Sequence, residues 1–253
     1  MMIMNVFHQY FRLGEYEFDM ADKKLGIIGG FGGYATLDFF RRILEKFQTD
    51  TERSYPHIIM DNNFKMPSRT RALLYGDNYQ EIVMEMATSM ERLLKLDVDA
   101  IVLPCGTAHA FLPDVYQLVP EAEEKVIHII RELGKGMQRC KIKKCLVLAA
   151  EGTLKQHVYA NSLSSYSIDC VEPGSGDYAT IRYFIESVKS GGDSRPKLNE
   201  AFLDFLEKFA IENVVLGCTE LPVLVQRLHI AQPIKFFDPL EYAIDSIYQI
   251  FRM

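Results

Sequence analysis

Two short segments of this chain share one pattern: an apolar run, a turn, and a cysteine close to a threonine. The first reads AIVLPCGT over residues 100–107, and the second reads VVLGCT over residues 214–219. A short apolar run that ends in a turn is typical of a fully buried strand. Parallel α/β sheets bind ligands at the carboxyl ends of their strands, so Cys105 and Cys218 lie where chemistry is expected. A single such cysteine is more simply explained as a small buried side chain, but two matched cysteines indicate a shared site.

The remaining sequence alternates apolar runs with amphipathic stretches, as in α/β proteins with parallel sheets. The apolar run at 126–130 is expected to open a second half. Each half begins with a strand that enters a glycine-containing loop, and each closes with a cysteine turn. This weak internal repeat predicts two pseudo-symmetric domains, each a parallel sheet flanked by helices, with the active site in the cleft between them. Strands are expected near 25–30, 57–60, 100–103, 144–149, 167–171, 214–216 and 233–237, and helices near 34–47, 79–96, 154–163, 178–188, 199–209 and 240–251.

Composition and charge exclude several classes of protein. A chain of 253 residues that is 48% apolar is large enough for one large core or two modest ones. Its net charge of −6 argues against a nucleic-acid partner or a membrane surface, and no apolar run is long enough to span a bilayer. Residues 1–22 are too polar and acidic for a signal peptide and are expected to be an extension, so a cytoplasmic protein is expected.

The cysteine count also limits the interpretation. Five cysteines, an odd number in a chain of this size, do not suit a disulfide framework. Cys140 and Cys145 lack both the spacing and the second pair of a zinc site. We therefore expect no metal, and we interpret Cys140, Cys145 and Cys170 as small hydrophobic side chains in or beside strands.

The glycine-rich loop and the arginine after the second strand each admit two interpretations. Gly30, Gly32 and Ala35 fit a dinucleotide-binding fingerprint, with Asp61 at the end of the next strand. The same loop before a helix binds any anion, and a nucleotide would leave the paired cysteines unexplained. Arg69, in the expected loop FKMPSRTRAL, is either a solvated surface residue or a grip for a carboxylate, because its planar fork pairs two oxygens at once.

Two titratable residues follow the cysteines closely. His109 comes four residues after Cys105, and Glu220 comes two residues after Cys218. Each either tunes the nearby thiol or makes a structural hydrogen bond. The sequence leaves both possibilities open.

Several motifs together resemble one known family. They are LGIIGGFGGYAT, DNNFKMPSRT, LPCGTAH, AEGT, VKSGG and LGCTELP. From about residue 24 to the C-terminus, the chain is similar to the cofactor-independent aspartate/glutamate racemases. The resemblance implies a first domain of residues 23–122 and 230–253, a second domain of residues 123–229, and assembly as a homodimer.

The same resemblance implies a role for each candidate residue. Cys105 and Cys218 match the two catalytic thiols that flank the substrate Cα. The other matches are basic residues that hold the substrate carboxylate and polar residues that line the site: Arg69 and Lys189 for the first group, and Asn62, Thr107 and Thr219 for the second.

Racemisation explains why two thiols are needed. A proton leaves one face of a carbon and another returns to the opposite face, which one base cannot easily do. A free thiol with a pKa of about 8.5 is only a few per cent ionised at neutral pH. Helix N-termini and the substrate ammonium would stabilise one thiolate, while the other remains a thiol and donates. No pyridoxal phosphate or other cofactor is therefore expected, and the expected substrate is an acidic amino acid, aspartate ahead of glutamate.

Four positions depart from the family pattern. Gly106 replaces an asparagine, Ser68 an aspartate, Gly33 a proline and Ala150 a threonine. Losing the asparagine is expected to weaken aspartate turnover or to favour a bulkier substrate, and Gly106→Asn is then expected to raise aspartate turnover. The alternatives are a related dicarboxylate isomerase or decarboxylase, or a catalytically weak protein that binds a ligand or a dinucleotide.

Overall fold

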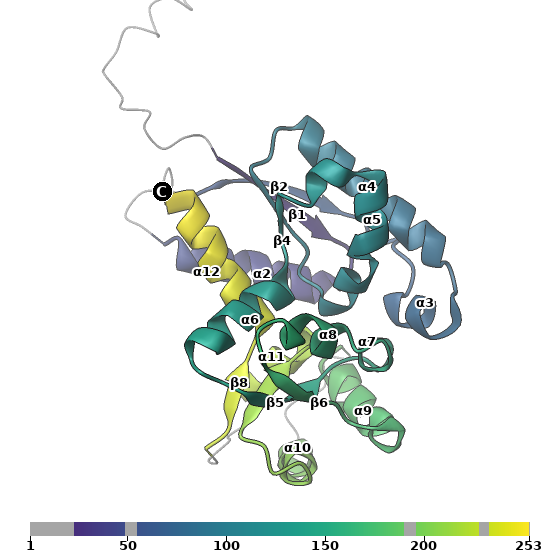
Figure 1. Cartoon of the computed structure of the whole chain (residues 1–253), viewed down its shortest axis with the longest axis vertical. Coiled ribbons are helices and arrows are strands. Elements are labelled where there is room, and N and C mark those ends of the chain that lie inside the picture. Colours follow the sequence, from purple (N-terminus) through teal and green to yellow (C-terminus); the bar gives the residue numbers. More distant parts are fainter. Residues whose placement is uncertain (1–22, 49–54, 190–195, 228–232, 253) are drawn as a thin grey trace, which may run out of the picture.

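The computed structural model describes residues 23–48, 55–189, 196–227 and 233–252. Within this part the chain forms two four-stranded sheets with helices packed around them (Figure 1). The expected extension, residues 1–22, lies outside the described residues. No helix of the described part combines the length and the apolar character needed to cross a lipid bilayer.

The two sheets have the same strand order. The first is β2-β1-β3-β4 and the second is β6-β5-β7-β8, and neighbouring strands are parallel throughout. Counted from the start of its own half, each sheet therefore follows the order 2-1-3-4, which confirms the predicted pair of pseudo-symmetric α/β sheets. The strands are β1 (Lys24–Gly29), β2 (His57–Asn62), β3 (Ala100–Val102), β4 (Val126–Ile127), β5 (Lys144–Leu148), β6 (Asp169–Val171), β7 (Asn213–Leu216) and β8 (Lys235–Phe237).

Helices connect the parallel strands and pack against the sheets. In Figure 1, α12 lies between the two halves, where it contacts α2 and α6. The α-helices are α2 (Gly33–Lys46), α3 (Arg69–Tyr75), α4 (Tyr79–Lys95), α5 (Leu112–Leu118), α6 (Ile129–Arg139), α7 (Glu151–Lys155), α8 (Val158–Ser164), α9 (Tyr178–Lys189), α10 (Pro196–Glu207), α11 (Glu220–Arg227) and α12 (Pro239–Arg252). The described part also contains the 3₁₀ helices η2 (Gly106–Phe111), η3 (Pro120–Ala122) and η4 (Ser175–Asp177).

One apolar cluster joins the two halves. It contains Leu25 and Phe39 of the first half and Leu146 and Phe202 of the second, together with the buried faces of α6 and α12. A second cluster packs α4 and α5 against the first sheet. Because burial of apolar surface is the main favourable term in folding, this shared cluster holds the two halves together.

The apolar run at 126–130 is not a single element. Val126 and Ile127 form β4, which pairs with β3 of the first sheet. His128 then caps α6, because its Nδ1 accepts a hydrogen bond from the Arg131 N–H at 3.3 Å. At the other end of the chain, β8 pairs with β7 of the second sheet. The boundaries expected at 122 and 230 would put β4 in the second domain and β8 in the first. In the structure, β4 pairs with the first sheet and β8 with the second. The division into two domains stays a prediction.

Two other elements also differ from expectation. The helix expected at 154–163 is divided into α7 and α8, because His157 between them has a left-handed φ of 50°. The expected loop FKMPSRTRAL contains α3, whose first N–H groups are capped by Ser68: its Oγ accepts from the Arg71 N–H at 3.3 Å. Arg69 is therefore the first residue of a helix and not a loop residue.

Candidate active site

A cavity of about 130 Å³ lies between the carboxyl ends of the two sheets. Residues that follow the central strands form much of its wall: Phe31 after β1, Cys105 after β3, Ala150 after β5 and Cys218 after β7. Such crevices are where open parallel sheets bind ligands. The two cysteines occupy equivalent positions in the two halves. The structure brings five of the seven predicted site residues to this cavity: Cys105, Cys218, Arg69, Thr107 and Thr219.

Cys105 is the N-cap residue of η2. Amide groups at the start of a helix favour a nearby negative charge, which is the usual way to favour a thiolate. The carbonyl oxygen of Cys105 makes a hydrogen bond with His109, whose Nδ1 lies 2.9 Å from that oxygen. The Ile129 N–H donates to the other ring nitrogen at 3.3 Å, so that nitrogen carries no proton and Nδ1–H is the donor to Cys105.

Burial keeps the His109 ring neutral. The side chain is buried, and desolvation lowers the pKa of His109 to about 4. Of the two possibilities that the sequence left open, the structural hydrogen bond is the one observed, since the ring binds the Cys105 carbonyl. His109 thus fixes the backbone that carries the first thiol.

Cys218 has a different electrostatic environment. Its Sγ–H donates to Glu220 Oε2 at 3.0 Å, and the Thr219 hydroxyl donates to the same oxygen at 3.3 Å. Glu220 also lines the cavity. A carboxylate next to a sulfur disfavours the thiolate form, because two negative charges repel each other. The geometry therefore favours Cys218 as a thiol and a proton donor.

Arg69 presents a cation to the cavity. Its guanidinium donates to the Pro67 carbonyl at 2.9 Å and to the Phe31 carbonyl, and it lies 5.2 Å from the centre of the Phe31 ring. Its Nε is buried and has no hydrogen-bond partner. Among the residues that the structure describes, no carboxylate forms an ion pair with it. A partly buried cation of this kind can pair with an anionic ligand.

Two threonines join the halves at the edge of the cavity. The hydroxyls of Thr107 in η2 and Thr153 in α7 lie 2.8 Å apart and are both buried. Close packing continues at Gly152, where an added Cβ would lie 3.0 Å from the Thr70 carbonyl oxygen. The EGT segment of one half thus packs directly against the CGT segment of the other.

Of the other two predicted substrate-binding residues, Asn62 does not line the cavity, and the side chain of Lys189 falls outside the described part of the chain. Asn62 ends β2 and is absent from the cavity wall; its Oδ1 is buried without a hydrogen-bond partner. Lys189 is the last residue of α9, one helical turn beyond the cavity residue Ile185, and its side chain lies outside the described part.

Packing accounts for the glycine-rich loop. Gly30 has a φ of +88°, and a Cβ there would lie 2.0 Å from the Asn63 carbonyl oxygen. A Cβ on Gly29 would lie 2.4 Å from Asn62 Oδ1. The loop needs glycine because it passes so close to the end of β2. The resemblance to a dinucleotide fingerprint therefore has a structural explanation that requires no nucleotide.

Tyr159 of α8 is the residue that sequence reasoning missed. Its hydroxyl donates to the carbonyl of Gly217, the residue before Cys218, at 3.1 Å. A Cβ on Gly106, the residue after Cys105, would lie 2.3 Å from the same hydroxyl. Nothing in the segment HVYANSL indicates an inward-pointing hydroxyl. The glycine at 106, where the family has a side chain, was the one available signal, and its φ is not in the left-handed region.

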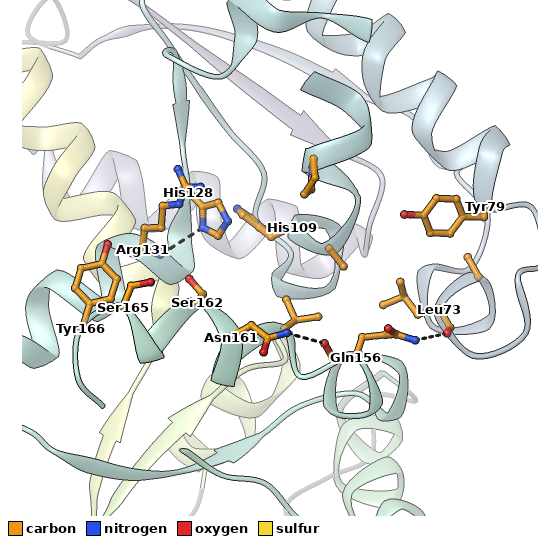
Figure 2. Close-up of a pocket in the computed structure, with 14 residues that line it drawn as sticks. Leu73, Tyr79, His109, His128, Arg131, Gln156, Asn161, Ser162, Ser165 and Tyr166 are labelled. Atoms are coloured by element: carbon orange, nitrogen blue, oxygen red, sulfur yellow. Dashed lines mark hydrogen bonds between the residues drawn. The ribbon is translucent and has the colours of Figure 1, made fainter. Parts of the chain in front are cut away.

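A larger cavity, of about 560 Å³, lies on the other side of η2 (Figure 2). Its wall includes His109 and His128, whose rings are 4.5 Å apart, and residues of α8 such as Asn161 and Ser162. Thus η2 separates two cavities: Cys105, Gly106 and Thr107 face the smaller one, and His109 faces the larger one.

Comparison with known proteins gives consistent results. Residues 28–247 match the family described as Asp/Glu/Hydantoin racemase. Glutamate racemase of Actinobacillus pleuropneumoniae serotype 7 is 22% identical over 173 residues, which are 65% of this chain and span only 62% of that relative's length. The broad specificity amino-acid racemase RacX of Bacillus subtilis is 22% identical over 83% of this chain and 91% of its own length.

Solved structures share the fold. Picrophilus torridus aspartate racemase superposes with a TM-score of 0.73 at 20% identity, covering 91% of this chain and 94% of that one. Glutamate racemase of Francisella tularensis, in complex with D-glutamate, gives a TM-score of 0.68 at 18% identity, covering 91% and 81% of the two chains. The chain therefore belongs to the Asp/Glu/Hydantoin racemase family.

Proposed function

We propose that this protein is a cofactor-independent racemase of an acidic amino acid, aspartate ahead of glutamate. In this proposal Cys105 and Cys218 transfer protons at opposite faces of the substrate Cα. The observation that carries the proposal is the pair of thiols, one from each half at equivalent strand ends, in the wall of a single small cavity that Arg69 also lines.

The surroundings of the two sulfurs suggest different resting states. In the scheme we assign Cys105, at the start of η2, as the base, and Cys218, whose Sγ–H donates to Glu220, as the acid. The Cys105 thiolate takes the Cα proton and becomes a thiol. The electron pair left on Cα then takes the proton of Cys218 from the opposite face, which leaves Cys218 as the thiolate. The reverse reaction exchanges these roles, so atoms and charge balance in both directions.

Arg69 has two tasks in this scheme. Its guanidinium would pair with the substrate α-carboxylate, which orients Cα between the sulfurs. The negative charge that develops when the proton leaves spreads into that carboxylate, so the same cation stabilises the transition state. Glu220 is placed to attract the substrate ammonium on the side of Cys218.

Cavity size and charge bear on the substrate. About 130 Å³ is well below the roughly 300–1,000 Å³ of pockets for drug-sized ligands, which suits a small amino acid. A second carboxylate needs a second cation, and Lys189 is our candidate. Phe31 and Ile185 add apolar surface to the wall. That surface, with the relative of broad specificity, favours neutral amino acids as the second candidate substrate class.

A chiral assay over a panel of amino acids tests the proposal. Dialysed protein, treated with chelator and carbonyl reagent and given no cofactor, is expected to racemise aspartate or glutamate faster than alanine or leucine. Activity that disappears with this treatment and returns with metal or pyridoxal phosphate would contradict the cofactor-independent mechanism. Faster turnover of the neutral amino acids would select the second substrate class.

We also propose that the protein is a cytoplasmic homodimer, as the family resemblance suggests. Light scattering of the purified full chain tests the assembly. A mass near twice 29.0 kDa is expected, and a single-chain mass at micromolar concentration would contradict it.

A further inference from the structure

The hydroxyl of Tyr159 lies between the two cysteine turns, and the proton transfer described above does not use it. We propose that Tyr159 is a positioning residue that fixes the spacing between the Cys105 turn and the Cys218 turn. The proposal rests on the proposed function for its kinetic consequences, but its structural basis is independent of the substrate.

The first argument is the contact with the Cys218 turn. Tyr159 donates to the Gly217 carbonyl at 3.1 Å, and this carbonyl belongs to the peptide unit that ends at the Cys218 nitrogen. Because a peptide unit is planar and rigid, the bond fixes the orientation of the backbone that carries the second thiol. Ring and backbone are also close, since a Cβ on Gly217 would lie 2.9 Å from Tyr159 Cε2.

The second argument is the contact with the Cys105 turn. A Cβ on Gly106 would lie 2.3 Å from the Tyr159 oxygen and 2.8 Å from the Gly217 carbonyl oxygen. The two turns therefore meet at the tyrosine hydroxyl, one from each half of the chain. The glycine at 106 is explained by this contact: the place of a side chain is already filled.

The third argument excludes an acid–base role. Tyr159 is 1% exposed, and burial, together with the nearby Cys105 and Cys218 side chains, raises its pKa well above the ordinary value. The hydroxyl consequently stays protonated throughout turnover. A neutral, buried group with one acceptor acts by holding that acceptor in place.

The experiment compares Tyr159→Phe with a matched control. Tyr79→Phe removes the same hydroxyl from a tyrosine that donates to Asp114 at 2.8 Å and does not line the cavity of the two thiols. We expect Tyr159→Phe to lower kcat about 3- to 10-fold, as for the loss of one neutral hydrogen bond, with KM changed less than about twofold. The control is expected to retain the kcat of the parent protein. Equal effects of the two variants, or an unchanged kcat in Tyr159→Phe, would overturn the proposal.

A double-mutant cycle tests the contact with Gly106. Gly106→Ala is expected to lower kcat by about tenfold or more in the parent protein, because the added methyl displaces the tyrosine or the turn. In the Tyr159→Phe background the same change is expected to be milder, since the clashing oxygen is gone. Equal losses in the two backgrounds would show that the contacts are independent and would overturn the assignment.

Thiol reactivity separates this proposal from the proposed function. Alkylation of Cys105 and Cys218 by iodoacetamide, followed by peptide mass spectrometry, requires no substrate. Both peptides are expected to react faster in Tyr159→Phe, and neither is expected to change in Tyr79→Phe. If the protein racemises no amino acid but the alkylation difference is found, the function fails and the positioning role stands. Unchanged alkylation of both peptides would contradict the positioning role.

Discussion

At the scale of single residues, the guanidinium of Arg69 combines rigid placement with the lack of an ion-pair partner within the described part of the chain. Two backbone carbonyls hold it, and its Nε is buried without a partner. A lysine would keep the positive charge but would lack the planar guanidinium, whose N–H groups can donate to both oxygens of a carboxylate. The geometry of binding, and not the charge alone, is therefore what a substitution here would change.

We predict that Arg69→Lys lowers kcat/KM for the acidic substrate. Charge-assisted hydrogen bonds contribute about 1.5–3 kcal/mol, which corresponds to a decrease of roughly 10- to 150-fold. Arg71→Lys is the matched control, because Arg71 lies two residues away, is exposed and pairs with Asp77. An unchanged kcat/KM in Arg69→Lys would return Arg69 to the solvated-surface interpretation.

Gly106 changes the expected outcome of one substitution. From sequence alone, Gly106→Asn is expected to restore a substrate contact. The position of the Tyr159 oxygen, 2.3 Å from an added Cβ, predicts instead that asparagine disturbs both cysteine turns. Aspartate kcat/KM should therefore fall in Gly106→Asn, and a rise would support the sequence-based interpretation.

At the scale of elements, α3 shows how a departure from the family pattern keeps the same local physics. Ser68 stands where the family has aspartate, and both residues are good helix N-caps. In this structure the Ser68 Oγ accepts from the Arg71 N–H at 3.3 Å. The cap sets the first turn of α3 and thereby the position of Arg69.

Ser68→Ala is predicted to destabilise the protein by about 0.5–2 kcal/mol, the usual effect of losing an N-cap. Urea unfolding measures this difference. Ser68→Asp is the control, since it keeps the cap and places a negative charge at the helix start, where it is favourable. Ser68→Ala as stable as the parent, together with a destabilised Ser68→Asp, would show that the cap is unimportant.

Elements with long hydrophobic patterns were predictable, and short ones were not. The periodic segments that became α2, α4 and α12, and the apolar runs that became β3 and β7, appear where the sequence places them. The apolar run at 126–130 was predicted wrongly as one element, because its pattern suits a strand or a buried helix equally. In the structure, His128 divides the run because it caps α6.

The candidate site was also predictable only where its residues follow a clear hydrophobic pattern. Its strand-end residues, Cys105 and Cys218, were predictable because strand ends of a parallel sheet converge. Tyr159 was not, since its hydroxyl reaches the site only through the packing of α8 of the second half against the cysteine turns. Contacts between segments distant in sequence leave no periodic pattern.

At the scale of the whole molecule, a buried neutral histidine links stability to pH. His109 joins η2 to α6 through both ring nitrogens, so protonation would break the acceptor contact with Ile129. Because the folded-state pKa of about 4 lies below the ordinary value, the unfolded chain binds more protons in acid. The stabilisation is complete above about pH 6.5 and is lost as the pH falls towards 4.

We predict a loss of stability on the order of 3 kcal/mol across this window from His109 alone. Urea unfolding at several pH values between 7 and 4 measures how the free energy of unfolding changes with pH. His109→Gln should reduce this pH dependence without abolishing it, because burial also lowers the pKa of the neighbouring His128. His57→Gln, at an exposed position, is the control that leaves both buried histidines in place. The same pH dependence of the free energy of unfolding in the parent and in His109→Gln would contradict a buried neutral imidazole at position 109.

The central claim is that one thiol from each half acts on each face of the substrate Cα. Its most direct test is racemisation of L- and D-aspartate in deuterium oxide by the parent protein, Cys105→Ser and Cys218→Ser, with circular dichroism spectra to verify folding. The parent is expected to place deuterium on Cα of the product enantiomer. Each serine variant is expected to retain its fold and to lose racemisation of both enantiomers. Racemisation by either folded variant at a rate near that of the parent would contradict the two-thiol mechanism.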